Sequence, residues 1–514
     1  MTPLAERRAQ ASQAEPAGYD HDPSPIGPGA AGRTASKSTL RLLINSGGDS
    51  RIAIDPATCR TPYGTPAGPA PDEIWLSSST ASAVSERGYA AAGDALDRLF
   101  VSDIIAAQTP IDWLDSVRAR LLTLFGIPGT EVVLSASGTE TELIALTLAR
   151  AVLQRPLTNI VLAPAETGSG VMRAASGSHF LSTTNCGEGV SPGMRLAGLE
   201  ADDIRVAGIH VRDGDGRVRP PSAIDEEAEA AVEAALRDDR GVLLHLLETS
   251  KTGLGGLTQK TARQLAAEAG DRLIVVVDAC QLRCEPETIR AELAAGFMVM
   301  ITGSKFAGGP PYCGALLVPP TLMARLTPCE QMPPPPGLAA YCTRSEWPEA
   351  LRGQFCAALG ERINFGVGLR WEAALAEIER YFAVAPSLRS GIATAFSRSV
   401  EMAIADRPFL QRFDPDEEHR CPTIVPVVGR GAHGHPVAAA ATYRSLIQAP
   451  RSCHLGQPVI IGPRAPLRFC LSMPHVVDAA QRLRAGASFE RAMLALETDI
   501  MAALDQWEAN ARRA

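Results

Sequence analysis

The sequence predicts an α/β fold built on a mainly parallel β-sheet, and three observations support this prediction. Between residues 115 and 320, short runs of β-branched and aliphatic residues alternate with Ala-, Leu- and Glu-rich stretches of helical spacing. The short runs are apolar throughout, which is typical of strands that are buried on both faces and joined by helices. Polar residues follow two of these runs, and ligands of parallel sheets bind at the carboxyl ends of strands.

Six apolar runs are the expected strands: residues 132–134, 160–162, 242–244, 273–277, 298–301 and 315–318. The expected helices between them include residues 141–153, 222–237 and 258–269. In the first helix, Ile144, Leu148 and Val152 fall on one face. In the last, Thr258 is suited to cap the start and Gly270 to end the helix.

The chain has 514 residues, enough for two or three domains with a large core. Residues 1–37 are rich in Ala, Pro, Gly and Ser and lack the apolar core of a secretory signal, so we expect a disordered tail. An N-terminal segment over 38–114, a large ligand-binding domain over 115–384 and a smaller α+β domain over 385–514 are expected to follow. The proline-rich stretch 331–337 is expected to be a loop at the active site or at a subunit contact.

Composition excludes several classes of function. The net charge is −8 and no run of Lys or Arg stands out, so we expect neither a nucleic acid nor a membrane surface as partner. No stretch of about 20 apolar residues predicts a transmembrane helix. The 11 unevenly spaced cysteines favour reduced thiols in a cytoplasmic protein. The pairs Cys280/Cys284 and His433/His435 lack further ligands, and we therefore expect no metal site.

Lys305 and Asp278 are the most informative pair of residues. Lys305 follows one apolar run within Gly303-Ser304-Lys305, and Asp278 ends another run 27 residues earlier. A buried ammonium is costly unless its pKa falls or it reacts. Pyridoxal 5′-phosphate (PLP) requires an amine that forms a Schiff base and a carboxylate that keeps the pyridine ring cationic. Each residue alone also has an ordinary interpretation, as a surface loop lysine or as an aspartate that caps a turn.

A second motif, Ser137-Gly138-Thr139-Glu140, follows a strand and opens a helix. Backbone N–H groups at such a helix start, together with the Thr139 hydroxyl, form a phosphate site that glycine allows the ligand to approach closely. Taken alone, the motif is a weak signal, because Ser-Gly-Thr followed by Glu is also a common helix cap.

These segments stand in the order found in a known family. Residues 137–140, 245–253, 278–281 and 303–305 resemble those of fold-type I PLP-dependent enzymes, and within them the class V aminotransferase superfamily that includes cysteine desulfurases. The resemblance covers about residues 115–320. It implies the fold-type I PLP-dependent transferase fold, PLP as cofactor and a homodimer.

The resemblance also implies roles for individual residues. Lys305 would carry the Schiff base and move a proton, Asp278 would face the pyridine nitrogen, and Gln281 would lie beside the ring oxygen. The remaining cofactor-binding residues would be Gly138, Thr139 and Ser304 at the phosphate and Thr167 and Thr249 near the ring. Relatives often carry a histidine or an aromatic residue in place of Thr167, and a threonine cannot act as an acid or base there.

Two residues near the C-terminus have alternative interpretations. Arg468 matches the family's arginine that binds the substrate carboxylate, a role for which its planar guanidinium is suited. A surface arginine on an edge strand is the alternative. Cys453 lies 15 residues before Arg468, as does the nucleophilic cysteine of some desulfurases, but its surroundings do not reproduce their motif, which favours a structural thiol.

The sequence thus predicts a cytoplasmic PLP-dependent enzyme that acts on an amino acid or an amine-bearing metabolite through an external aldimine. Amino-group transfer is the leading interpretation. The alternatives are a lyase or desulfurase that performs β- or γ-elimination, a specialised enzyme of secondary metabolism, and a cofactor-binding regulator without catalysis.

Overall fold

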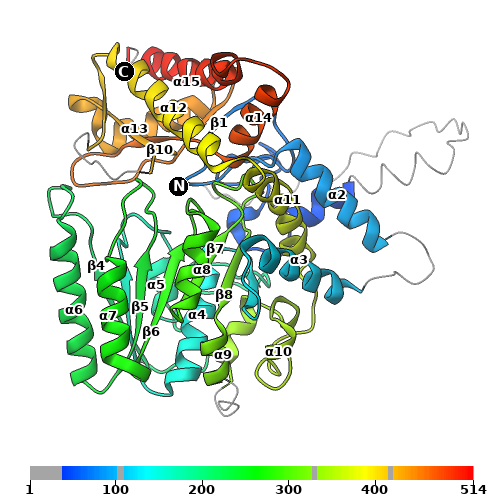
Figure 1. The fold of residues 1–514 in the computed structure, drawn as a ribbon, viewed down its shortest axis with the longest axis vertical. Coiled ribbons are helices and arrows are strands. Elements are labelled where there is room, and N and C mark those ends of the chain that lie inside the picture. Colours follow the sequence, from blue (N-terminus) through cyan, green and yellow to red (C-terminus); the bar gives the residue numbers. More distant parts are fainter. Residues whose placement is uncertain (1–37, 101–108, 327–332, 415–420, 513–514) are drawn as a thin grey trace, which may run out of the picture.

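The computed structural model describes residues 38–100, 109–326, 333–414 and 421–512. The predicted tail over residues 1–37 lies outside the described residues. Figure 1 shows a large sheet covered by helices on both faces and a smaller group of strands and helices above it. Within the described ranges, no helix is long and apolar enough to cross a membrane.

The large sheet has seven strands in the order β2-β8-β7-β6-β5-β3-β4. Their bounds are Glu131–Ser135 (β2), Gly314–Val318 (β8), Met298–Thr302 (β7), Leu273–Ala279 (β6), Gly241–Leu247 (β5), Leu157–Leu162 (β3) and Ile204–Ile209 (β4). All neighbours pair in parallel except β8, which is antiparallel to both β2 and β7. The predicted α/β fold with a mainly parallel sheet is confirmed.

The strands of this sheet separate two hydrophobic cores. Along β6, Val275 and Val277 belong to one core, whereas Ile274 and Val276 belong to the other. The alternation follows from the strand geometry, in which successive side chains point to opposite faces of the sheet. All six predicted strands are present. The sequence analysis missed β4, whose central residues are partly exposed and include Arg205.

Helices cover both faces of the sheet (Figure 1). The first core is closed by α3 (Pro110–Phe125), α6 (Pro221–Arg237), α7 (Gln259–Ala269), α8 (Pro286–Ala294) and α11 (Phe365–Phe382). The second is closed by α4 (Gly138–Leu153), α9 (Pro320–Leu326) and residues 338–359, which include the short α10 (Glu349–Arg352). The short helix α5 (Val171–Ala175) packs on α4.

The smaller part of the molecule contains two further sheets. An antiparallel sheet joins β9 (Leu410–Arg412), β10 (Ile424–Gly429) and β12 (Leu467–Cys470), and β1 (Ile74–Leu76) pairs in parallel with β11 (Cys453–Leu455). Its helices are α12 (Pro386–Ala405), α13 (Pro436–Ile447), α14 (Met473–Arg484) and α15 (Phe489–Ala511). The pairing of β1 with β11 brings the N-terminal segment into the C-terminal part of the fold, and α2 (Glu86–Phe100) then packs on α11.

A buried arginine connects the start of the described chain to the large domain. Arg370 of α11 donates hydrogen bonds to the carbonyl oxygens of Ile44 (3.0 Å) and Ser46 (2.6 Å) and to that of Tyr312. Carbonyl oxygens that would otherwise be buried without a donor are satisfied in this way. The segment that follows, including Asp49 and Arg51, is thereby held beside the carboxyl ends of the central strands.

Part of the proline-rich stretch is described, whereas Gln331 and Met332 lie outside the described residues. Gly337 donates a hydrogen bond from its backbone N–H to the carbonyl oxygen of Ala197 (3.0 Å), and Pro336 packs against Gly198. From Pro333 onward, the stretch contributes no residue to the main cavity described below. A role at a subunit contact remains a prediction.

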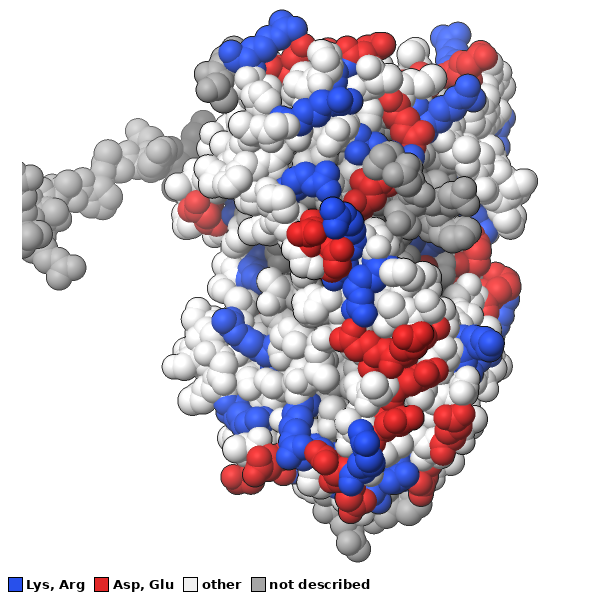
Figure 2. Space-filling model, turned by 90° about the vertical axis from the view of Figure 1, so that its left-hand side faces the viewer, with Lys and Arg blue, Asp and Glu red and all other residues white. Residues whose placement is uncertain are grey.

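Charged side chains are mixed on the surface. On the face shown in Figure 2, Lys and Arg side chains are interspersed with Asp and Glu. This face presents no broad field of one sign, in keeping with the sequence composition.

Candidate active site

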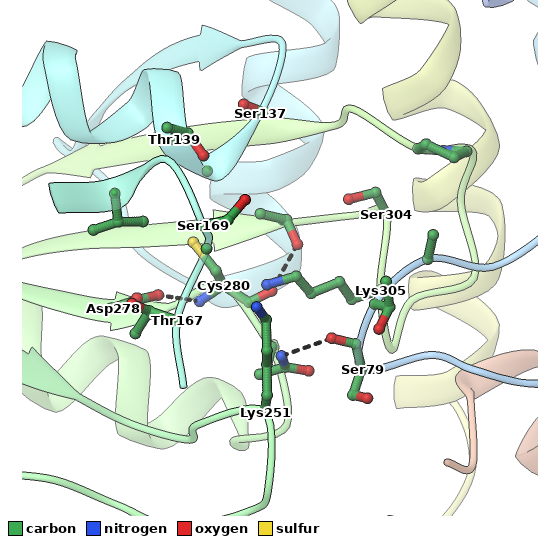
Figure 3. Close-up of a pocket in the computed structure, with 18 of the residues that line it drawn as sticks. Ser79, Ser137, Thr139, Thr167, Ser169, Lys251, Asp278, Cys280, Ser304 and Lys305 are labelled. Atoms are coloured by element: carbon green, nitrogen blue, oxygen red, sulfur yellow. Dashed lines mark hydrogen bonds between the residues drawn. The ribbon is translucent and has the colours of Figure 1, made fainter. Parts of the chain in front are cut away.

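A cavity of about 340 Å³ lies at the carboxyl ends of the central strands. Its walls come from the ends of β5, β6 and β7, from the start of α4, and from the segments around residues 51, 80, 167 and 457. Figure 3 shows the polar side chains that line it. Parallel α/β sheets bind their ligands at this position because the strand ends and the helix starts meet there.

Asp278 lies at the carboxyl end of β6, in register between Leu247 of β5 and Met300 of β7. Its Oδ1 accepts a hydrogen bond from the backbone N–H of Cys280 (3.0 Å), and its side chain lines the cavity (Figure 3). The apolar strand makes the backbone rigid, and the N–H of Cys280 fixes the direction of the carboxylate.

Lys305 lies in the connection between β7 and β8 and reaches into the same cavity (Figure 3). The turn is held by hydrogen bonds from the N–H of Gly303 to the carbonyl of Cys313 (2.7 Å) and from the N–H of Gly309 to the carbonyl of Gly303 (2.9 Å). A Cβ atom on Gly303 would come within 2.5 Å of the Cβ of Ala374 on α11. Glycine is therefore required for the close packing that positions Lys305.

The predicted phosphate motif forms one wall of the cavity. Ser137 is the N-cap of α4, and Gly138 and Thr139 are its first two residues. Their N–H groups have no preceding carbonyl within the helix, so they are available to an anion. A Cβ atom on Gly138 would lie 2.9 Å from the Sγ of Cys280. The glycine thus lets the helix start lie directly against the end of β6.

The other predicted cofactor-binding residues also meet at this cavity. Thr167, Thr249, Gln281 and Ser304 all line it. The amide of Gln281 donates a hydrogen bond from Nε2 to the carbonyl oxygen of Ser79 (3.1 Å), which fixes the side chain against the N-terminal segment. The structure thus brings all eight predicted cofactor-binding residues together, and their roles at a cofactor remain predictions.

Arg468 is placed differently from these residues. It is fully buried on β12 and does not line the cavity. Its guanidinium donates hydrogen bonds to the hydroxyls of Ser79 (3.0 Å) and Thr80 (2.9 Å) and to the carbonyl of Gln457. These three residues do line the cavity, so Arg468 supports its wall from behind. Direct contact between Arg468 and a substrate carboxylate remains a prediction.

Cys453 and Cys280 are both poorly suited to nucleophilic attack in this structure. Cys453 is fully buried in β11, outside the cavity, and burial raises the pKa of its thiol to about 12. Cys280 lines the cavity, but burial, with the nearby negative charge of Asp278, raises the pKa of its thiol well above the usual value. Thiolates are the nucleophilic form, so both thiols are in the unreactive state.

A buried ionic pair lies on the strand next to Asp278. The Nε2 of His245 on β5 lies 3.3 Å from the Oε2 of Glu142 on α4. Burial disfavours the imidazolium form, but the Glu142 carboxylate outweighs it and raises the pKa of His245 above its usual value. The Nδ2 of Asn159 donates a hydrogen bond to the other oxygen of Glu142 (2.7 Å). Glu142 itself lines the cavity, so this pair forms part of the cavity wall.

Arg51 is a site residue that the sequence analysis missed. It lines the cavity from the N-terminal segment, forms an ion pair with Asp49 (2.6 Å), and lies over the rings of Phe180 and Tyr312 at 5.3 and 4.9 Å. Its place depends on the hydrogen bonds of Arg370 to residues 44–46, contacts between segments more than 300 positions apart. No local motif around Arg51 indicated this role.

Lys251 lies within residues 245–253, one of the segments that carry the family resemblance. In the structure its side chain enters the cavity, and it lies near Lys305 in Figure 3. Burial, together with the positive charges of Arg468 and Lys305, lowers the pKa of Lys251 to about 7. A signal was available: of the 49 Lys and Arg residues in the chain, only four are lysine, and two of those four line this cavity.

Comparisons with known proteins place the fold. No protein-family model matches the chain, and no curated protein matches its sequence. Among solved structures, the chain is similar to a cysteine desulfurase from Thermococcus onnurineus NA1, at 14% identity and a TM-score of 0.51, over 81% of this chain and 96% of that chain.

Two further structures are similar to nearly the same extent. One is the ureidoglycine-glyoxylate aminotransferase of Bacillus subtilis (13% identity, TM-score 0.50, 86% of this chain and 98% of that chain). The other is TDC from Oryza sativa, solved with PLP (15% identity, TM-score 0.50, 96% of this chain and 92% of that chain). At these identities the similarity establishes architecture. The chain therefore has the fold of the fold-type I PLP-dependent transferases, as the sequence predicts.

Proposed function

We propose that the protein is a PLP-dependent enzyme that acts on an amino acid or an amine-bearing metabolite and transfers its amino group. One observation carries the proposal. Lys305 and Asp278 enter one cavity from the ends of neighbouring strands, beside the free N–H groups at the start of α4. An amine, a carboxylate and an anion site in this arrangement match three of the polar parts of PLP: its aldehyde, its pyridine nitrogen and its phosphate.

The residues present fit the cofactor in several respects. The N–H groups of Gly138 and Thr139 would hold the phosphate together with the hydroxyls of Thr139 and Ser304. The absent side chain of Gly138 leaves room at this point, since a Cβ atom would already contact Cys280. Within the described ranges, Lys305 has no ion pair, so its amine is available to an aldehyde.

When bound, PLP supplies an electrophilic carbon and an electron sink for bonds at the carbon that bears the substrate amine. The residues of this chain do the rest. Asp278 would hold a proton at the ring nitrogen, because its carboxylate is already oriented by the N–H of Cys280. Lys305, released by the incoming amine, would move a proton between the substrate α-carbon and the cofactor.

Amino-group transfer is favoured over thiol-dependent elimination by the state of the cysteines. Transfer requires a proton carrier, and Lys305 is suitably placed. A desulfurase that stores sulfur on a cysteine requires a thiolate at the cavity, whereas Cys453 is buried elsewhere and Cys280 is held protonated.

Absorbance spectroscopy of the PLP-loaded protein tests the proposal. Addition of a panel of L-amino acids should convert the yellow aldehyde form to the amine form for at least one donor, and pyruvate or 2-oxoglutarate should restore it. Release of pyruvate or sulfide with the aldehyde form retained would identify elimination instead. A protein that binds PLP but responds to no donor would indicate a regulator and contradict the proposal.

A further inference from the structure

We propose that Lys251 is the residue of this cavity that binds the carboxylate of the amino-acid substrate. The inference rests on the proposed function and deepens it, because it names the part of the substrate that is recognised and the side chain that recognises it. Four independent features of the structure lead to this assignment.

The first feature is the way the loop is held. The backbone N–H of Lys251 donates a hydrogen bond to the carbonyl of Glu166 (3.0 Å), and the Glu166 carboxylate accepts hydrogen bonds from the hydroxyls of Ser250 (2.8 Å) and Thr252. The residues on both sides of Lys251 are thus fixed to one buried carboxylate. Arg212 completes this arrangement by an ion pair with Glu166. The loop is rigid, and the lysine side chain projects from it into the cavity.

The second feature is that the amine has no partner of its own. Throughout the part of the chain that the structure describes, no carboxylate lies within ion-pair distance of the Lys251 amine. Glu166, the negative charge that acts on Lys251, is already engaged by Arg212, Ser250 and Thr252. A partly buried amine without an anion is costly, and an anionic group of the ligand would satisfy it.

The third feature is that the other positively charged side chains at the cavity already have partners or another role. Each of the three guanidinium nitrogens of Arg468 donates a hydrogen bond, to Ser79, Thr80 and Gln457, and the side chain is buried behind the cavity wall. Arg51 is held by a two-oxygen contact with Asp49 and lies between two aromatic rings. Lys305 is reserved for the cofactor aldehyde. Lys251 is the cavity-lining cation among the described residues that is left for a substrate anion.

The fourth feature is the choice of lysine in a chain that uses arginine almost everywhere else. The positive charges of Arg468, behind the cavity wall, and of Lys305, within the cavity, both act on Lys251, and they would repel a third permanent positive charge. The carboxylates that line this cavity are Glu142, Glu166 and Asp278, and the negative charge of Glu166 opposes the two positive charges at Lys251. A lysine can release its proton when the cavity is empty and regain it when an anion enters, whereas an arginine cannot.

The low pKa of Lys251, about 7, gives this assignment a measurable signature. A bound carboxylate favours the charged amine and raises the pKa of Lys251. Between the pKa values of the free and the bound forms, binding must therefore take up a proton. As pH rises above the pKa of Lys251 in the PLP-loaded protein without substrate, the protonated fraction of that protein falls, and affinity for a carboxylate should fall by about tenfold per pH unit. Below that pKa the affinity should be nearly constant.

Isothermal titration of the PLP-loaded protein tests the inference. The probes are propionate and succinate, which lack an amine and cannot react with the cofactor, with propionamide as the uncharged control. Titrations at pH 8 in two buffers of different ionisation enthalpy report proton uptake, which we expect to approach one proton per site for the carboxylates. Propionamide should bind more weakly and without proton uptake.

Two substitutions of Lys251 distinguish the effect of its positive charge from the effect of its protonation and deprotonation. Lys251→Met should weaken carboxylate binding at pH 7 by about 10- to 100-fold, the factor that corresponds to a charged hydrogen bond, and remove the dependence on pH. Lys251→Arg should retain binding but lose proton uptake, because a guanidinium remains charged. Lys260→Met removes an exposed lysine of α7 and serves as the matched control, with binding unchanged.

The inference would be overturned if the wild-type protein bound neither carboxylate, or bound them without proton uptake. Both results can be measured without any variant. Carboxylate binding by Lys251→Met at the wild-type level would also overturn it. Its failure is distinguishable from failure of the proposed function. A protein that takes up no PLP refutes the proposed function, whereas a PLP-loaded, active protein with pH-independent carboxylate binding refutes only the role of Lys251.

Discussion

The two sides of the cavity are built in different ways. The side that we assign to the cofactor comes from one sheet and the helix that begins beside it: Asp278 ends β6, Lys305 follows β7, and Gly138 opens α4. The side that we assign to the substrate combines Lys251, which follows β5 of the same sheet, with Arg51 from the N-terminal segment and Gln457 from the C-terminal part of the chain. The strands of one sheet and an adjacent helix start thus position the residues that we assign to the cofactor, whereas long-range packing places Arg51 and Gln457 on the side that we assign to the substrate.

This difference between the two sides explains which site residues could be predicted from the sequence. Each residue on the cofactor side follows an apolar run or opens a helix, so local pattern was enough to locate Asp278, Lys305 and Gly138. The strands themselves were found because runs such as 273–277 are buried on both faces and contain no polar interruption.

The substrate side could not be predicted in the same way. The position of Arg51 depends on hydrogen bonds between Arg370 and residues 44–46, and that of Ser79 depends on Arg468. The short strands β1 and β11 have three residues each and pair across more than 370 positions. Strands of this length leave no periodic pattern, and their pairing is a property of the assembled fold.

The largest effect is expected on the cofactor side. Lys305→Ala should reduce turnover by more than about 10⁴-fold, because it removes both the amine that holds the cofactor and the proton carrier. Steady-state kinetics with the best donor measures the loss, and Lys260→Ala is the control. Substantial residual turnover would show that another amine serves the reaction. The assignment of one side of the cavity to the cofactor and the other to the substrate would then be wrong.

A smaller loss is expected at the carboxylate. Asp278→Asn keeps the size of the side chain and can still accept the hydrogen bond from the N–H of Cys280, but it removes the charge that would face the pyridine nitrogen. Turnover should fall by about 10²- to 10³-fold, the range found when one preorganised electrostatic contact is removed. PLP should remain bound, as absorbance will show. Wild-type turnover in this variant would show that the pyridine nitrogen of PLP does not face residue 278.

A packing test addresses the contact between α4 and β6. Gly138→Ala places a Cβ atom 2.9 Å from the Sγ of Cys280, and overpacking of this kind costs about 1–3 kcal/mol. Urea denaturation should show a loss of this size, with weaker binding of PLP. In the background of Cys280→Ala the same substitution should cost much less. Equal costs in both backgrounds would show that Cys280 is not the obstacle.

The smallest effect is expected at Cys453. Because its thiol is buried outside the cavity, Cys453→Ala should leave turnover unchanged and lower the free energy of unfolding by only about 1 kcal/mol. Kinetics and urea denaturation of the same preparation measure both quantities. Abolished activity in a well-folded variant would instead indicate a thiol-dependent elimination, with a sulfur carrier on the substrate side.

The most direct test of the central claim is the identity of the lysine that binds the cofactor. The PLP-loaded protein is reduced with borohydride, digested, and mapped by mass spectrometry, and the result is simple to assign because the chain has only four lysines. The account predicts a pyridoxyl group on Lys305 and none on Lys251. A label on Lys251, or no label on either residue after loading with PLP, would contradict it.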